Sequence, residues 1–115
     1  MNIRAIADKI GLDYENIIED FCGDVAALGS KLSAFTETCK LDGLKTAMEN
    51  KDYDAVRSEA KKIRKAAEKV GLKDLKKVAE HAEEAKDDKL HSAVSSLIQK
   101  YEEIAKYLDA DKAEN

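Results

Sequence analysis

Hydrophobic positions along this 115-residue chain recur with the period of an α-helix. Two segments show the pattern most clearly: residues 54–70, which end before Gly71, and the segment that follows a possible N-cap at Asp88. Their apolar positions are spaced by three or four residues: Val56, Ala60, Ile63, Ala67 and Val70 in the first, and Leu90, Val94, Leu97, Tyr101, Ile104 and Leu108 in the second. Each segment is predicted to be a helix with one buried face.

A third helix is predicted between these two, over about residues 73–85. Its expected core positions are Leu75, Val78, Ala82 and Ala85. The turns on either side, at residues 71–72 and 86–88, are short. Because short turns leave no room for a crossover, sequential helices are expected to lie antiparallel.

The pattern in the first 50 residues is less regular. Residues 3–10 suggest a short helix ending at Gly11, and Asp13 is a possible N-cap for a second helix that contains Ile17, Ile18 and Phe21. Apolar positions then continue to about Asn50, with possible breaks at Gly23-Asp24 and near Asp42-Gly43. One kinked helix and two or three separate pieces both fit this pattern.

Together these elements predict a single all-α domain, an antiparallel up-down four-helix bundle over residues 24–109. Residues 1–22 are expected to form a short helical cap, and residues 110–115 a frayed tail. The composition agrees, since the chain has no proline and only five glycines, fewer turn residues than a β protein of this length needs.

Charge and hydropathy argue against several classes of partner. The net charge of −4 gives no overall bias toward nucleic acid. Every uncharged stretch of the sequence is well short of the ~20 residues of a membrane span. The first ten residues do not resemble a signal peptide, because charged side chains interrupt the apolar ones. These features favour a soluble cytoplasmic protein that is a monomer or weak dimer and is not associated with membranes.

No recognisable catalytic or metal-binding motif occurs, so no catalytic residue, metal or cofactor is predicted. The two cysteines, Cys22 and Cys39, form no CxxC pair and are interpreted as free thiols on or near a helix core face. The two histidines, His81 and His91, have no neighbour of a catalytic type and are interpreted as flank or surface residues.

The segment from Asp52 to Leu75 resembles the core of histidine phosphotransfer (HPt) domains. In that family, an Asp–aromatic turn leads into a helix that carries Ala-His-x-Leu-Lys-Gly and ends in an apolar residue and Gly. Asp52-Tyr53 matches the turn. The residues that fall at the family's spacing are Ala60, Ile63, Arg64, Val70, Gly71 and Leu75. The resemblance covers roughly Leu12 to Leu108.

Two departures from the family pattern affect the expected function. Lys61 occupies the phosphoacceptor position, and Lys65 replaces the glycine that lets a partner approach. A protonated lysine is a poor nucleophile, whereas a neutral imidazole can accept a phosphoryl group. The resemblance therefore implies a non-enzymatic, HPt-like protein that binds a receiver domain or a histidine kinase in two-component signalling.

Helix geometry gives the expected binding face. At about 100° per residue, Lys61 and Lys65 project almost directly away from the apolar stripe, and Arg64 flanks them. Receiver domains, the usual partners of this family, carry an acidic pocket. Lys61, Arg64 and Lys65 are therefore the predicted partner-binding residues, although an ordinary charged surface would show the same pattern.

Two other functions remain open from the sequence. The chain could be an active phosphotransfer protein that uses His81 or His91, although neither lies in the family's motif. It could also be a structural or oligomerising helical bundle without a role in signalling, because its narrow apolar stripes permit helix exchange between chains.

Overall fold

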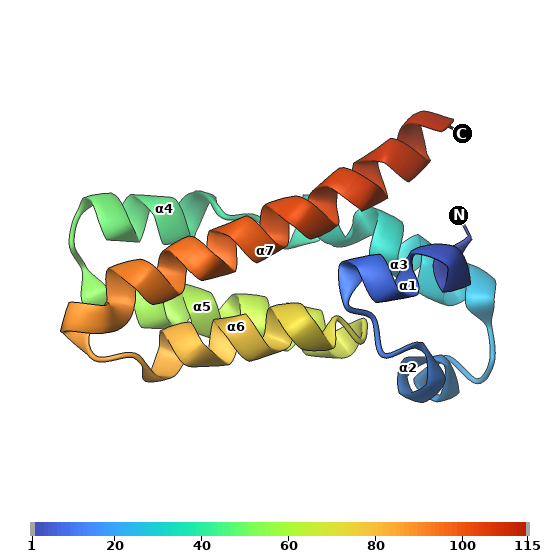
Figure 1. Ribbon diagram of the computed structural model, residues 1–115, viewed down its shortest axis with the longest axis horizontal. Helices are drawn as coiled ribbons and strands as arrows, with labels where there is room; N and C mark the ends of the chain where they lie inside the picture. Colours follow the sequence, from blue (N-terminus) through green and yellow to red (C-terminus); the bar gives the residue numbers. More distant parts are fainter. Residues whose placement is uncertain (1, 115) are drawn as a thin grey trace.

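The computed structural model describes the backbone of residues 2–114 and the side chains of residues 2–110. Within this range the chain contains helices and no β-strand, so the predicted all-α class is confirmed (Figure 1). The helices are α1 (Ile3–Ile10), α2 (Tyr14–Asp20), α3 (Val25–Thr38), α4 (Asp42–Glu49), α5 (Tyr53–Lys69), α6 (Lys73–Glu84) and α7 (Asp87–Glu114).

The helices lie mostly along the long axis of a body that measures 41 × 27 × 19 Å. In Figure 1, α3 and α4 follow one another along this axis, α5 returns, and α6 and α7 each reverse direction again. α5 packs on α4 and α6, and α7 packs on α6, α3 and α1. The short turns between α5, α6 and α7 therefore produce the antiparallel neighbours that the sequence predicts.

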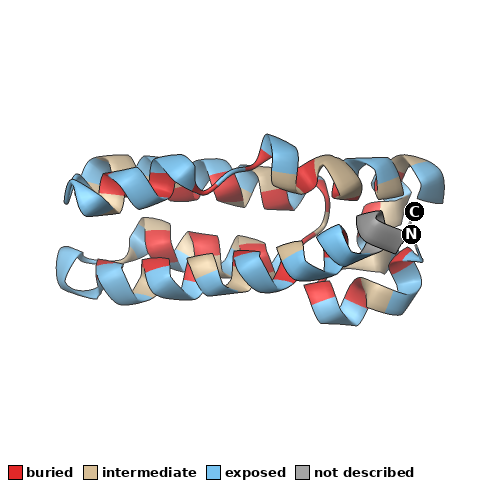
Figure 2. Ribbon diagram, turned by 90° about the horizontal axis from the view of Figure 1, so that it is seen from above, coloured by how far each residue is buried: buried red, intermediate tan, exposed pale blue. Residues whose placement is uncertain are grey.

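The buried residues form one hydrophobic cluster on the helix sides that face one another (Figure 2). Every predicted core position of α5 and α7 is buried. In α6, however, the buried residues are Leu75, Ala79 and Ala82, while Val78 and Ala85 are only half-buried. Because α6 contacts both α5 and α7, its buried face is centred on Ala79 rather than on Val78.

The first half of the chain contains separate helices rather than one kinked helix. The break between α2 and α3 occurs at Gly23, whose positive φ of 79° favours glycine. The carboxylate of Asp24 then accepts a hydrogen bond of 3.0 Å from the Ala27 backbone N–H and caps α3. The predicted break at these two residues is thus confirmed.

The break between α3 and α4 comes earlier than predicted, at Cys39–Leu41 instead of Asp42-Gly43. Cys39 and Leu41 are both buried, but residues two apart point to different sides of a helix. The extended backbone at Cys39 allows both side chains to reach the core. Tyr101 of α7 stabilises this linker, since its hydroxyl donates a hydrogen bond to the Cys39 carbonyl. Burial raises the pKa of Tyr101 to about 12 and that of the Cys39 thiol to about 11.

Replacing Tyr101 with phenylalanine is expected to lower the free energy of unfolding by about 1–2 kcal/mol, because the Cys39 carbonyl loses its hydrogen-bond donor. Urea unfolding followed by circular dichroism measures this loss. Tyr107→Phe is the matched control, because Tyr107 is 37% exposed. Its expected change is below about 0.5 kcal/mol. Equal losses in the two variants would show that the Tyr101 bond contributes nothing.

The N-terminal residues are tied to the turn between α5 and α6. Leu12 and Leu72 form an isolated antiparallel bridge, and the Asp13 backbone N–H donates a 2.8 Å hydrogen bond to the Gly71 carbonyl. Asp13 precedes α2 as predicted, although its side chain makes no capping bond and instead accepts from the Asn16 amide. The division into a cap over residues 1–22 and a bundle over residues 24–109 stays a prediction.

The last helix is longer than predicted. α7 begins at Asp87, which puts the predicted N-cap Asp88 inside its first turn. The helix continues through Glu114, and the frayed tail predicted for residues 110–115 stays a prediction, with Asn115 outside the described residues. The alanine, lysine and glutamate residues of this segment are good helix formers, and nothing in it breaks a helix.

Candidate functional site

α5 carries the segment that resembles the HPt motif, and its polar residues fall on three sides. Asp52 caps the start of the helix, since its carboxylate accepts a 3.2 Å hydrogen bond from the Ala55 backbone N–H. Its apolar stripe faces the core. The remaining positions point toward α6, toward α3 or away from the protein. These three surroundings decide what each charged residue of the segment can do.

The side of α5 toward α6 is neutralised by ion pairs. Arg64 Nε donates a 2.5 Å hydrogen bond to Glu83 of α6, and Arg64 also lies 3.9 Å from Glu68. Both Arg64 and Glu83 are largely shielded, with side chains 23% and 19% exposed. The hydrogen bond to Glu83 raises the pKa of Arg64. This predicted partner-binding residue is therefore already engaged within the chain.

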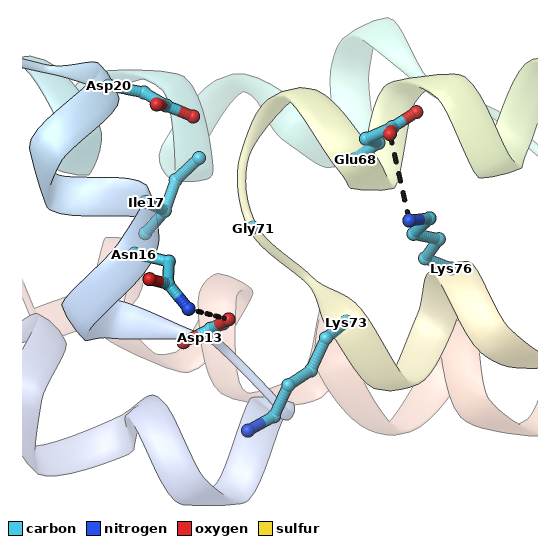
Figure 3. Close-up of a pocket in the computed structure, with 8 residues that line it drawn as sticks. All are labelled: Asp13, Asn16, Ile17, Asp20, Glu68, Gly71, Lys73 and Lys76. Carbon is cyan, nitrogen blue, oxygen red and sulfur yellow. Dashed lines mark hydrogen bonds and ion pairs between the residues drawn. The ribbon is translucent and has the colours of Figure 1, made fainter.

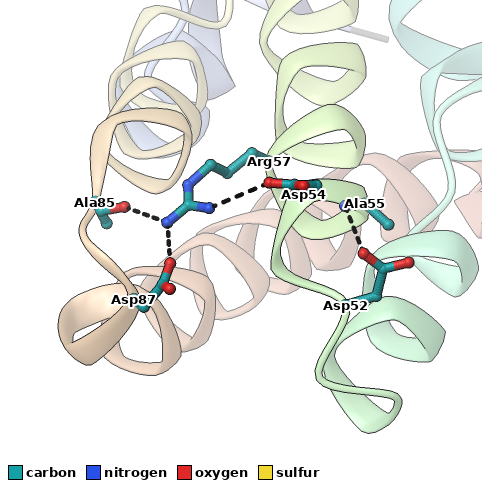
Figure 4. Close-up of polar contacts among 6 residues, drawn as sticks. All are labelled: Asp52, Asp54, Ala55, Arg57, Ala85 and Asp87. Carbon is teal, nitrogen blue, oxygen red and sulfur yellow. Dashed lines mark hydrogen bonds and ion pairs between the residues drawn. The ribbon is translucent and has the colours of Figure 1, made fainter.

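Arg57, one turn from the start of α5, holds the turn between α6 and α7. One of its terminal nitrogens donates to the Ala85 carbonyl at 3.0 Å and to Asp87 at 2.5 Å, and the other lies 3.8 Å from Asp54 (Figure 4). Ala85 ends α6 and Asp87 begins α7. Arg57 therefore has a structural role, because its guanidinium group binds the end of α6 and the start of α7 and is not free to bind a partner.

The outer face of α5, defined here by Lys61 and Lys65, points away from the core, and both residues are exposed. Among the residues whose side chains are described, Lys61 has no polar partner. The ammonium group of Lys61 is thus available to an external anion. Helix periodicity alone predicts this outward direction.

Beside the outer face, a groove of about 540 Å³ runs between α3 and α5. Its floor is apolar, and its rim carries lysines from both helices. The floor consists of Phe21, Ala34, Phe35, Ala66 and Val70, and the rim lysines are Lys31, Lys62, Lys65 and Lys69. We call this feature the α3–α5 groove. Lys31, Lys62 and Lys69 are not among the predicted partner-binding residues, although the spacing of Lys62, Lys65 and Lys69 places those three toward one side of α5.

A smaller cavity of about 170 Å³ lies between α2 and the turn from α5 to α6 (Figure 3). Both acidic and basic side chains line it, and Glu68 and Lys76 form an ion pair of 3.6 Å there. Asp13 accepts a hydrogen bond of 2.8 Å from Asn16. The mixed charge and these internal contacts give the cavity no preference for an anion or a cation.

The remaining candidates for chemistry are scattered. His81 on α6 and His91 on α7 are both exposed. Cys22 is exposed and Cys39 is buried, and both are free thiols. Within residues 2–110, no three side chains of histidine, cysteine, aspartate or glutamate are grouped so that they could hold a metal ion.

No helix in the described part of the chain is both long enough and apolar enough to span a membrane.

Comparison with known proteins gives no relative. No protein-family model, curated protein or solved structure matches this chain.

Proposed function

We propose that this chain is a non-catalytic, HPt-like protein that binds a receiver domain through the outer face of α5. In this proposal, α3 together with α4 is the first helix of an HPt-type four-helix bundle, and α5, α6 and α7 are the other three. The partner would be a response-regulator receiver domain, or a histidine kinase that carries one, and both the chain and its partner would be cytoplasmic.

The observation that carries the proposal is the position of Lys61. This residue is the midpoint of α5, is exposed and has no polar partner among the described side chains. It also stands where the resemblance expects the phosphoacceptor histidine. The expected features around it are present, because Asp52 caps the helix and Gly71, after its end, has a positive φ of 76°.

The chemistry of Lys61 favours binding over phosphoryl transfer. A lysine becomes a nucleophile when it is desolvated, and Lys61 is exposed to water. An exposed ammonium group can instead enter an acidic pocket, where its charge steers association and fixes orientation. Lys65, one turn further along α5, adds a second positive charge to the same face.

Charge reversal at Lys61 tests this proposal. We expect Lys61→Glu to weaken binding to a receiver domain by about tenfold or more, because a carboxylate would face the acidic pocket. The measurement is biolayer interferometry with the immobilised full chain and a panel of purified receiver domains. The matched control is Lys106→Glu, which makes the same charge change at an exposed position of α7.

Two results would contradict the proposal. One is a panel in which no receiver domain binds the wild-type chain. The other is a receiver domain that binds Lys61→Glu as tightly as it binds wild type and Lys106→Glu. A matching thermal unfolding curve for each variant shows that a loss of binding is not a loss of folding.

A further inference from the structure

The α3–α5 groove is a second surface that borders the outer face, shares Lys65 with it and does not include Lys61. We infer that this groove binds an acidic amphipathic helix of a partner protein. The inference depends on the groove's shape and charge and does not depend on the HPt resemblance.

The groove walls have the length and spacing of a helix-binding site. On α3 they are formed by Lys31, Ala34, Phe35 and Thr38, and on α5 by Lys62, Lys65, Ala66 and Lys69. Both sets follow the pattern i, i+3, i+4, i+7, which covers two turns, or about 10 Å of helix. Two such stripes on antiparallel helices leave a straight trough, and a helix fills a trough of this kind by inserting its own i, i+3, i+4 and i+7 side chains.

The floor of the trough offers apolar contacts to a partner helix and lets that helix approach closely. Phe35 and Val70 are buried beneath it, while Phe21, Ala34 and Ala66 are half-buried and remain accessible. The two alanines have short side chains, so another helix can lie close to the backbones of α3 and α5. An apolar stripe of leucine or isoleucine residues on the partner would bury these exposed surfaces.

The rim determines the charge of the partner helix. Each of the four lysines carries a positive charge, although the chain as a whole has a net charge of −4. Among them, Lys62 forms an ion pair of 3.1 Å with Glu59. Lys31, Lys65 and Lys69 make no ion pair with any side chain in residues 2–110. Because Lys31 and Lys69 lie on opposite walls, acidic residues along both flanks of the bound helix complement the rim.

An anionic lipid shares part of this chemistry, but the geometry favours a helix. Small-molecule sites enclose most of the ligand surface. In the α3–α5 groove, by contrast, the rim lysines are exposed and charge extends along both sides rather than at one end. An open trough with charge along both sides matches the side chains of a helix better than a single headgroup.

A designed peptide tests the inference on the full chain. The probe is a fluorescent amphipathic helix of about 15 residues with one leucine stripe and glutamates on both flanks. We expect it to bind wild type, and we expect Lys31→Glu and Lys69→Glu each to weaken binding by about tenfold in fluorescence anisotropy. Binding should also weaken as salt rises. Backbone amides of α3 and α5 that line the groove should shift in nuclear magnetic resonance spectra.

Control variants separate this site from the proposed receiver site. Lys106→Glu should leave peptide binding unchanged, and Lys61→Glu should affect the receiver domain far more than the peptide. A peptide with lysine flanks, or with alanines in place of the leucines, should not bind. The inference is overturned if the glutamate peptide fails to bind wild type, if Lys31→Glu and Lys69→Glu bind it unchanged, or if oleate binds the groove and the peptide does not.

Discussion

Replacing Gly71 with alanine is expected to lower the free energy of unfolding by roughly 3 kcal/mol, from backbone strain and overpacking together. Gly71 has a positive φ of 76°, which a residue with a Cβ adopts at a cost. A Cβ at this position would lie 2.6 Å from the Cβ of Ile17 and 2.8 Å from its Cγ1. The hydrogen bond from the Asp13 N–H to the Gly71 carbonyl fixes the two segments, so neither can move away easily.

Gly23 provides a matched control for the backbone component. Its φ of 79° is nearly the same as that of Gly71, but a Cβ at Gly23 would have no neighbour within 4 Å. Gly23→Ala should therefore cost only the left-handed backbone penalty, about 1–2 kcal/mol. Urea unfolding followed by circular dichroism compares the two variants. Equal losses would show that the contact with Ile17 is absorbed without cost.

A double variant identifies the clash itself. Ile17→Ala alone creates a cavity, yet it also removes Cγ1 and Cγ2, two of the three Ile17 atoms that the new methyl group would meet, and leaves only the Cβ contact. Combined with Gly71→Ala, it should destabilise the protein by less than the sum of the two single changes. Simple additivity would show that the Cγ atoms of Ile17 contribute nothing to the Gly71→Ala loss.

Under the proposed HPt-like function, introducing the histidine and glycine of the HPt motif into α5 is expected to convert the chain into a phosphoryl acceptor. The double variant Lys61→His, Lys65→Gly puts an imidazole at the exposed midpoint of α5 and removes the adjacent side chain. In the expected transfer, a neutral imidazole nitrogen forms a P–N bond while the P–O bond of the receiver's phosphorylated carboxylate breaks and the free carboxylate is released. Wild type should show no label, and the variant should become labelled with acid-labile phosphate. The glycine itself should lower the free energy of unfolding by about 1 kcal/mol.

The control for this prediction moves the histidine by one position. Lys62→His, Lys65→Gly has the same composition change, but residue 62 lines the α3–α5 groove instead of the outer face. It should remain unlabelled. Absence of label on the Lys61→His variant, with a receiver domain that binds wild type, would contradict the HPt interpretation of α5. Label on wild type would instead favour the alternative in which His81 or His91 is the acceptor, and His81→Ala and His91→Ala would identify which one.

The helices with regular periodicity were predictable because local pattern and tertiary burial agree. The apolar stripes of α5 and α7 are complete, and all their residues are buried. In α6 the pattern admitted two neighbouring stripes. Val78 is the larger apolar residue, but contact with both α5 and α7 buries Ala79 instead. The buried face of α6 depends on both neighbouring helices, so the sequence of α6 alone does not determine it.

In the candidate site, too, some features follow from the sequence and others depend on how the helices pack. The outward direction of Lys61 and Lys65 follows from helix geometry alone. The engagement of Arg64 with Glu83 depends on how α5 lies against α6, and the pairing of Lys31 with the α5 lysines depends on the register of α3 beside α5. Side chains that are 19 or more residues apart meet only after the helices pack.

By itself, the sequence determined the all-α class, the buried faces of α5 and α7, and the outward direction of the lysine at the midpoint of α5. These features depend on helix period and residue type. Only the tertiary structure decided where α3 ends, which face of α6 is buried, and that lysines from α3 and α5 line one groove. The hydrogen bond from Tyr101 to the Cys39 carbonyl illustrates the reason. It joins residues that are 62 positions apart in the sequence, and helix periodicity gives no information about contacts over such a separation.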